Sequence, residues 1–466
     1  MYHRCLKARR ESLLLKQPAV MQVFAGIFIL MAALPGAAQQ TPPASTQAPL
    51  TLTLQDAMTR ARANSVPFQA ALTDQGLARQ DKVQARSALL PSVSYDNAFI
   101  YTQGTGSPEV TGANQPAGVA APRFIANNAV REYLSQGVVQ QVIGYGLVSD
   151  YRKTSALEAV ARARAEIASR GLVVTVVQSY YGLIAAQRKY ANTQQAATEA
   201  EKFLSLSRKL ENGGEVAHAD VIKAQIQYQG RQRDLREAQL AMDKARLDLA
   251  VLIFPDFNQN FTVVDDTQLA PPLQSLEDFS RMAQSRNPEL RASSASLQAA
   301  KYEVSASRAG YFPDLTLNYF YGIDAPNFAA NSPEGFRNLG YAASATLNIP
   351  VWNWGATRSK VAQSDLRRKQ AQRELSLAQR KLQADMRALY AEADAARAEL
   401  DLLKSSAELA AESLRLTNLR YQGGEATALE VVDAQNTLTQ ARNAYDDGTA
   451  RYRIALANLQ TLTGTM

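Results

Sequence analysis

The side chains that most often carry enzyme chemistry are scarce in this sequence. Its 466 residues include one cysteine, Cys5, and two histidines, His3 and His218. A disulfide framework, a zinc finger or a Cys/His metal cage would need more of both. Ser-His-Asp catalysis would have to use His218, and no Gly-x-Ser-x-Gly motif or phosphate-binding loop accompanies it. We therefore predict a protein that is not an enzyme and that holds no metal and no cofactor.

One pair of carboxylates has a spacing that suits contact with ions. Glu430 and Asp433 lie three residues apart, so a helix would place both on one face. Three copies around one axis would bring six such carboxylates together, and a bound cation would relieve their repulsion. A solvated helix face is the alternative. The adjacent residues Asp265 and Asp266 are interpreted as a linker turn.

The basic charge of the chain is concentrated at its N-terminus. Of 50 basic and 43 acidic residues, five basic and one acidic lie in 1–38, which leaves 45 against 42 and a net charge of +3. The remaining net charge is too small to indicate a nucleic-acid-binding surface. The segment has a basic start, an apolar run over 20–34 and small residues at 35–38, the pattern of a secretory signal peptide. A membrane anchor is the alternative, but a run of about 15 residues is short of the ~20 that span a bilayer.

The remaining chain is duplicated. Residues 210–225 (LENGGEVAHADVIKAQ) and 420–435 (RYQGGEATALEVVDAQ) share Gly-Gly-Glu, Val and Ala-Gln at an offset of 210, and Gly146 pairs with Gly355 at an offset of 209. Each copy reads as a helical segment (54–90 and 276–310), two short strands, a very long helix and a return helix. The predicted division is a signal peptide, an N-terminal tail, a first repeat, a linker and a second repeat: 1–38, 39–53, 54–254, 255–275 and 276–466.

The long helices carry a seven-residue apolar repeat, with two rows that alternate in steps of three and four. In the second copy these rows are Leu375, Leu382, Leu389, Ala396, Leu403 and Ala410, and Met386, Ala393, Leu400, Ala407, Leu414 and Tyr421. This pattern is the a/d seam of a coiled coil. No proline interrupts 147–210 or 351–420. We therefore predict continuous helices of about 65–70 residues, roughly 100 Å long at ~1.5 Å per residue.

Four short segments alternate apolar and polar residues, as β-strands do. The apolar face is predicted to hold Tyr95, Phe99, Leu317, Tyr319, Leu347 and Ile349. The second segment, around Leu134, Val138 and Val142, has a weaker pattern. Strands of about ten residues with an apolar outer face and a polar inner face are typical of membrane barrels, whose interfaces are rich in aromatics such as Trp352 and Trp354. A half-buried soluble sheet, which has the same period, is the alternative.

The number of strands has a consequence for assembly. A spanning sheet must close on itself, because a bilayer offers no hydrogen bonds to an open edge. Spanning barrels begin at about eight strands, and one chain offers four. Two chains would give a barrel filled by its own side chains, whereas three would give twelve strands and a lumen. The segments 104–129 and 322–338, rich in Gly, Pro and Asn, are predicted as exposed loops beyond the strands.

With these features together, the chain resembles the TolC-like outer-membrane efflux protein family over about 50–465. The resemblance is carried by the two Gly-Gly-Glu…Val…Ala-Gln segments, by LNIPVWNWGATRSKV at 347–361 with its weaker partner VVQQVIGYGLVSDYRK at 138–153, and by the duplicated order. It implies a mainly α fold with a small β part. In that fold a homotrimer forms a twelve-stranded outer-membrane β-barrel, continued by a long periplasmic α-helical coiled-coil barrel.

The resemblance also implies a function. The protein would be the outer-membrane exit duct of a tripartite efflux system, including multidrug efflux, or of a type I secretion system. Its expected partners are a periplasmic membrane-fusion adaptor, an inner-membrane pump of RND or ABC type and outer-membrane lipid, but no nucleic acid. A periplasmic coiled-coil adaptor protein is the alternative function, since it would share the signal peptide and the helices but would not need four barrel-like strands.

Two glycine pairs, Gly213-Gly214 and Gly423-Gly424, follow the long helices. Glycine just past a helix end permits the left-handed turn that reverses the chain between antiparallel helices. The resemblance adds that these pairs lie at the periplasmic helix tips where the adaptor docks. A turn with no contact role is the alternative for each pair.

The resemblance assigns an entrance role to residues next to these turns. Glu430 and Asp433 match positions that line the closed periplasmic entrance. Asp220 and Tyr421 match a pair that latches it. A basic latch partner of the family falls on Ala426 in this chain, which predicts a weaker or different latch.

Overall fold

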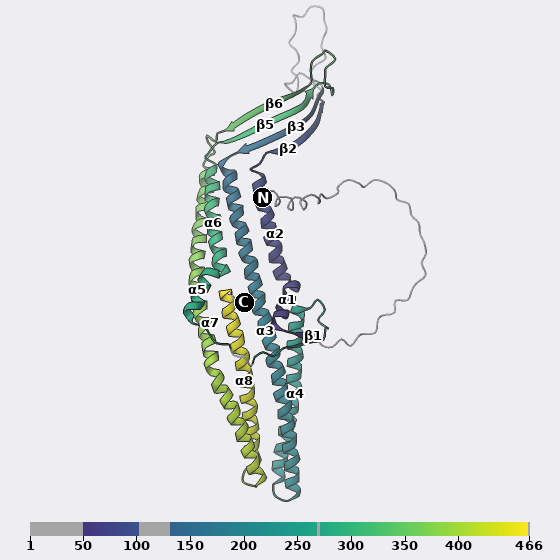
Figure 1. Cartoon of the computed structure of the whole chain (residues 1–466), viewed down its shortest axis with the longest axis vertical. Coiled ribbons are helices and arrows are strands. Elements are labelled where there is room, and N and C mark those ends of the chain that lie inside the picture. The colour runs from purple at the N-terminus through teal and green to yellow at the C-terminus, as the bar shows by residue number, and fades with distance from the viewer. Residues whose placement is uncertain (1–49, 102–130, 268–270, 465–466) are drawn as a thin grey trace, which may run out of the picture. The chain divides into compact units, whose positions relative to one another are not determined.

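The computed structural model describes residues 50–101, 131–267 and 271–464. The predicted signal peptide, most of the N-terminal tail and the predicted loop 104–129 lie outside these ranges. The described residues form eight helices and six strands, with a four-stranded sheet at one end of the helices (Figure 1). None of the helices in these ranges has a stretch apolar enough to span a membrane.

Two long helices dominate the fold, as predicted. Helix α3 (Tyr145–Asn212) has 68 residues and α7 (Ala356–Gln422) has 67. Each is followed by a return helix of 36 residues, α4 (His218–Ile253) or α8 (Ala428–Thr463), which packs along it (Figure 1). Every residue of the two predicted seven-residue rows in α7 is buried or half-buried, so the coiled-coil seam is confirmed.

The two shorter helical segments are each split into two helices. Residues 54–90 form α1 (Leu54–Asn64) and α2 (Val66–Ser87), and residues 276–310 form α5 (Leu276–Arg286) and α6 (Pro288–Ala309). The breaks fall at Ser65 and Asn287, whose side chains accept hydrogen bonds from the backbone N–H three residues later, at 3.4 and 3.0 Å. A proline lies in the first turn that follows each cap, where its missing N–H costs nothing.

The four-stranded sheet is antiparallel and has the order β2-β3-β5-β6. Its strands are β2 (Ser92–Tyr101), β3 (Arg131–Ile143), β5 (Asp314–Ala325) and β6 (Leu339–Asn348). The predicted loop 322–338 therefore begins too early, since 322–325 continue β5. Gly322 is needed there, because a Cβ at this position would overlap the Ser135 carbonyl and Gln136 of β3.

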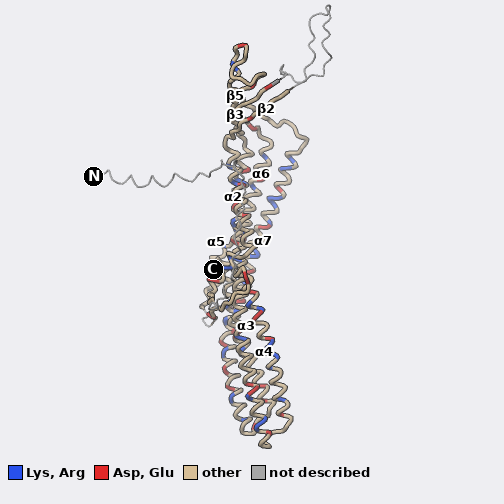
Figure 2. The backbone as a smooth tube through the Cα atoms, turned by 90° about the vertical axis from the view of Figure 1, so that its right-hand side faces the viewer, with Lys and Arg blue, Asp and Glu red and all other residues tan. Residues whose placement is uncertain are grey.

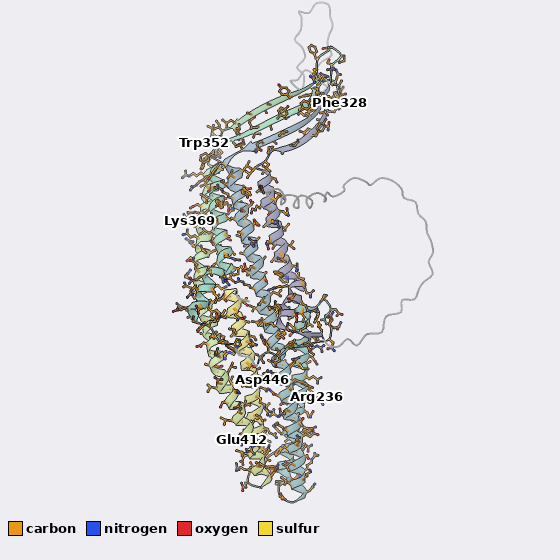
Figure 3. All side chains as sticks on the ribbon, viewed as in Figure 1. Arg236, Phe328, Trp352, Lys369, Glu412 and Asp446 are labelled. Carbon is orange, nitrogen blue, oxygen red and sulfur yellow. The ribbon has the colours of Figure 1, made fainter. Side chains whose placement is uncertain are left out.

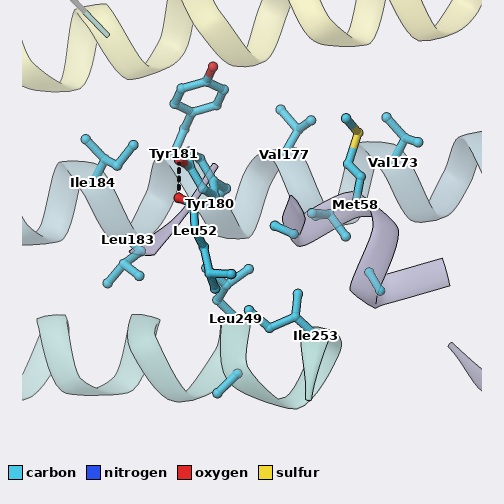
Figure 4. Packing of buried hydrophobic residues seen from close by; sticks show 14 of the residues in the cluster. Leu52, Met58, Val173, Val177, Tyr180, Tyr181, Leu183, Ile184, Leu249 and Ile253 are labelled. Carbon is cyan, nitrogen blue, oxygen red and sulfur yellow. Dashed lines mark hydrogen bonds between the residues drawn. The ribbon is translucent and has the colours of Figure 1, made fainter. Parts of the chain in front are cut away.

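A second, two-stranded sheet was not predicted. Strand β1 (Leu50–Leu52) pairs in parallel with β4 (Phe261–Val263), which lies inside the predicted linker 255–275. Strands of three residues are too short to show a period. The sheet is fixed to α3 by Tyr180, whose hydroxyl donates to the carbonyl of Leu52, 3.2 Å away (Figure 4). The same hydroxyl lies 2.7 Å from the carbonyl of Val264, the residue after β4.

Candidate functional site

The turns at the α3–α4 and α7–α8 tips have the same backbone geometry. Gly214 and Gly424 have φ of 79° and 75°, a left-handed conformation that favours glycine. In both turns the N–H of the next residue bonds the carbonyl five residues earlier, at 2.9 and 2.8 Å, which closes the helix end. Gly213 and Gly423 have ordinary φ values of −78° and −85°. The turn itself therefore requires only the second glycine of each pair.

The helices that leave the two turns start differently. At the second tip, Thr427 Oγ1 accepts from Glu430 N at 3.3 Å and Glu430 Oε1 accepts from Thr427 N at 3.1 Å, which is a capping box. At the first tip the equivalent positions hold Ala217 and Asp220. Ala217 caps nothing, and Asp220 pairs with Lys223 at 3.2 Å. The duplication thus conserves the turn and not the cap.

The two carboxylates of the predicted acidic ring have different surroundings. Glu430 is held by Thr427 and by Arg420, whose Nη1 lies 3.4 Å from Glu430 Oε2. Hydrogen bonds from the Thr427 backbone and hydroxyl, and the nearby Arg420 charge, lower the pKa of Glu430 below its ordinary 4.5. The exposed Asp433 carboxylate has no hydrogen bond or ion pair within the described ranges. Of the two, Asp433 is the carboxylate left available to a solute.

Tyr421, predicted to form a latch with Asp220, lies inside the protomer. It is 2% exposed, its hydroxyl lies 3.0 Å from Ser207 Oγ, and its ring lies 5.2 Å from that of Phe203. This contact joins α7 to α3 within a cluster to which α4 and α8 also contribute. The structure does not bring Asp220 to Tyr421. Arg420 is the basic residue at this tip. Its contact with Glu430 was not predicted from the sequence, because Arg420 precedes the turn, whereas the position of the family's basic partner, Ala426, follows it.

The strand register places the predicted lipid-facing residues on one face. Directly opposed residues of an antiparallel pair point the same way. One such row is Tyr95, Gly137, Tyr321 and Tyr341, across all four strands. Every second residue along each strand, counted from this row, lies on the same face. That face holds Tyr95, Phe99, Leu317, Tyr319 and Leu347, and Ile349 follows just beyond the end of β6. Each of these six side chains is exposed in the single chain.

The register corrects the prediction for β3. Leu134, Val138 and Val142 lie on the opposite face of the sheet, and β3 contributes Tyr133, Val139 and Ile143 to the apolar face instead. Because β3 carries apolar residues on both faces, alternation alone does not decide which face is which. The opposite face of the four described strands contains four acidic residues and no Lys or Arg: Asp96, Glu132, Asp314 and Asp324.

Asp265 and Asp266, interpreted from the sequence as a linker turn, anchor that linker. Arg188 of α3 pairs with Asp265 at 2.7 Å and with Asp446 of α8 at 2.9 Å, while Arg453 of α8 pairs with Asp266 at 2.8 Å. Burial acts to raise the pKa of Asp265, but hydrogen bonds from Thr267 and Arg188 outweigh it and lower the pKa. The linker is thereby tied to both long helical hairpins.

Comparisons with known proteins agree with this architecture. The sequence model described as outer membrane efflux protein matches residues 279–465. The proteases secretion protein PrtF of Dickeya chrysanthemi is 22% identical over 424 residues, covering 89% of this chain and 88% of PrtF. The alkaline protease secretion protein AprF of Pseudomonas aeruginosa is 24% identical over 411 residues, covering 86% of this chain and 82% of AprF. Over residues 279–465, the chain is therefore similar to the outer membrane efflux protein family.

The fold agrees with this similarity. A crystal structure of a membrane protein from Pseudomonas aeruginosa superposes with a TM-score of 0.76 at 21% identity, covering 88% of this chain and 93% of that chain. The predicted mainly α fold with a small sheet is confirmed. One relative, TolC of Vibrio cholerae, is named an outer membrane protein and is 22% identical over 301 residues, covering 64% of this chain and 68% of TolC.

Proposed function

We propose that the protein is the outer-membrane exit duct of a tripartite efflux or type I secretion system. One observation carries the proposal: the four-stranded sheet has one apolar face, and its outer strands β2 and β6 each have an unpaired edge within the described chain. In a bilayer those edges have to be paired by other copies. Three copies give twelve strands and a lumen, so the duct is a homotrimer.

The oligomeric state and the conductance of the protein test this proposal. Native mass spectrometry of the detergent-solubilised protein should show trimers, and planar bilayers should show discrete conductance steps. Monomers or dimers alone, or a protein that never conducts, would contradict the proposal. The periplasmic adaptor function is then the alternative, and it places the protein in the periplasmic or inner-membrane fraction.

The long helices bring the tips within reach of periplasmic partners. At ~1.5 Å per residue, α3 and α7 are each about 100 Å long. Their exposed tips are the proposed docking site of a membrane-fusion adaptor that connects the duct to an inner-membrane pump of RND or ABC type. Gly213 and Gly423 are the informative positions, because the turns do not need them. We expect Gly423→Val to preserve trimers and to abolish adaptor co-purification, whereas a turn-only role predicts unchanged capture.

The periplasmic entrance is proposed to carry the acidic ring. Because Glu430 is engaged by Thr427 and Arg420, Asp433 supplies most of the field that a cation meets. In planar bilayers Asp433→Asn should lower cation preference and weaken block by multivalent cations more than Glu430→Gln does. If the two variants together behave like the wild type, the ring is elsewhere. The proposed latch predicts that Asp220→Ala with Tyr421→Phe raises conductance and leaves cation block intact.

The cargo class follows from what the relatives are named for. PrtF and AprF are named for the secretion of proteases. We propose transport and no catalysis for this chain, with a polypeptide or a small toxic molecule as cargo. Deletion of the gene should therefore raise sensitivity to toxic compounds or abolish secretion of a protein, and plasmid-borne wild type should restore the phenotype.

A further inference from the structure

An exposed aromatic loop joins the sheet to α7. In residues 349–355, Val351 is 88%, Trp352 74% and Trp354 89% exposed, and the two indole rings meet edge to face 5.8 Å apart. Figure 3 shows Trp352 at the junction between the strands and the helices. Neither indole N–H has an acceptor within the described part of the chain. Tryptophan usually finds such an acceptor, and an exposed aromatic cluster marks an interaction surface.

The backbone holds this loop in a costly conformation. Trp354 has φ of 54° and is the only residue other than glycine with positive φ in the described ranges, and Gly355 follows at 83°. The loop is closed by a bond from Ala356 N to Asn353 O at 3.0 Å and by contact of the Asn353 amide with the Thr357 hydroxyl. Left-handed conformations of bulky residues persist mainly where a site depends on them. Here the strained turn presents both indoles to the surroundings.

The environment of the loop indicates its partner. The loop continues the apolar face of the sheet through Leu347 and Ile349. The nine helical residues next to the sheet in each of α2, α3, α6 and α7 together contain nine Lys or Arg and three Asp or Glu (79–87, 145–153, 301–309 and 356–364; Figure 2). Both α3 and α7 begin at the sheet without an acid in the first turn, although a helix N-terminus favours one. The region is therefore apolar and aromatic on one side and basic on the other.

We propose that this junction binds anionic phospholipid headgroups of the periplasmic leaflet, with Trp352 and Trp354 seated among them and Arg358 and Lys360 facing the phosphates. Indole rings concentrate at the headgroup level of bilayers, and basic residues beside a membrane attract anionic lipid. The inference rests on the proposed function, because it requires the sheet to lie in a membrane. It adds a lipid specificity that the duct itself does not need.

The first test uses the protein's own fluorescence, because Trp352 and Trp354 are its only two tryptophans. The trimer is reconstituted in phosphatidylcholine vesicles containing phosphatidylglycerol. We expect blue-shifted emission, quenching by lipids brominated near the headgroup and little quenching by iodide. Water-like emission that iodide quenches and brominated lipid does not would overturn the proposal.

A cysteine probe separates this failure from failure of the membrane assignment. In a Cys5→Ser background, Leu317→Cys on the apolar face should resist an aqueous maleimide in the same vesicles. Protected Leu317→Cys with water-exposed tryptophans would refute the headgroup site alone. Labelled Leu317→Cys would refute the spanning sheet and with it both proposals.

The second test addresses charge. Phosphatidylglycerol added to detergent micelles should raise the thermal midpoint of the wild-type trimer more than phosphatidylcholine does. Arg358→Gln with Lys360→Gln should lose this difference. The matched control, Arg373→Gln with Arg380→Gln, removes the same charge from α7 farther from the sheet and should keep it. Equal responses of the two double variants would overturn the assignment of the phosphate contacts.

Discussion

Replacing Thr427 by alanine isolates the contribution of one helix cap at the predicted entrance. The substitution removes the hydroxyl that accepts from Glu430 N at 3.3 Å and donates to Glu430 Oε1 at 3.1 Å. Loss of a threonine N-cap costs about 0.5–2 kcal/mol. Since ~1.4 kcal/mol is a factor of ten in an equilibrium, local opening of the first turn of α8 should become about 2- to 30-fold more frequent.

Native-state hydrogen exchange followed by mass spectrometry measures this opening. Amides over 428–432 in Thr427→Ala should exchange faster by that factor, while amides over 218–222 at the first tip serve as the internal control. The first tip, which Ala217 leaves uncapped, should already exchange faster than the second in the wild-type protein.

The reverse substitution makes the comparison symmetrical. Ala217→Thr would create Thr-x-x-Asp with Asp220, and the chain already forms a complete capping box of this composition between Thr53 and Asp56. Protection over 218–222 should therefore rise. Equal exchange of the two tips in the wild type, with no effect of either substitution on its own tip, would contradict this account of the caps.

Three further outcomes are expected. Leu317→Arg should prevent assembly in the outer membrane, because a lipid-facing arginine costs about 2–4 kcal/mol at mid-membrane, whereas Thr316→Arg on the other face should assemble, as judged by trimer bands in outer-membrane fractions. Tyr180→Phe should lower the free energy of unfolding by about 1–3 kcal/mol in thermal or denaturant melts, since two carbonyl contacts are lost. Because the pKa of Glu430 is lowered in the folded state, its stabilising effect is present above pH 4.5 and is lost as the pH falls below that value. The protection of amides over 428–432, measured relative to their intrinsic exchange rate at each pH, should therefore fall there in the wild type and not in Glu430→Gln.

The parts of the fold that the sequence predicts well are those with a long period. The a/d rows of α7 repeat over about five heptads, so the helix, its seam and its length follow directly. Three strands alternate clearly enough to assign a face. Strand β3 does not, because Tyr133 and Leu134 are both apolar and only pairing with β2 and β5 decides which faces outward.

The parts that the sequence could not predict depend on contacts between distant segments. Strands β1 and β4 have three residues each and are defined only by their pairing. The linker is held by Arg188, 77 residues before Asp265 in the chain. The two tips share the Gly-Gly-Glu motif, but the position of Thr427 in the second tip is occupied by Ala217 in the first. This difference is visible in the sequence and predicts that only the second tip has a side-chain N-cap.

At the tips of one protomer, the residues that hold the two helical hairpins together are different from the residue whose charge is available to a solute. Tyr421 and Ser207, both buried, join the two helical hairpins in a cluster to which all four long helices contribute, so parting these hairpins would expose apolar surface and break a buried hydrogen bond. Glu430 is tied to its own protomer by Thr427 and Arg420, whereas Asp433 is exposed and unpaired within the described chain. In the proposed trimer, widening the proposed entrance by moving whole protomers would leave this cluster intact. If Asp433 lies in the proposed acidic ring, that motion would carry it away from the axis, so we expect opening to weaken cation block in planar bilayers.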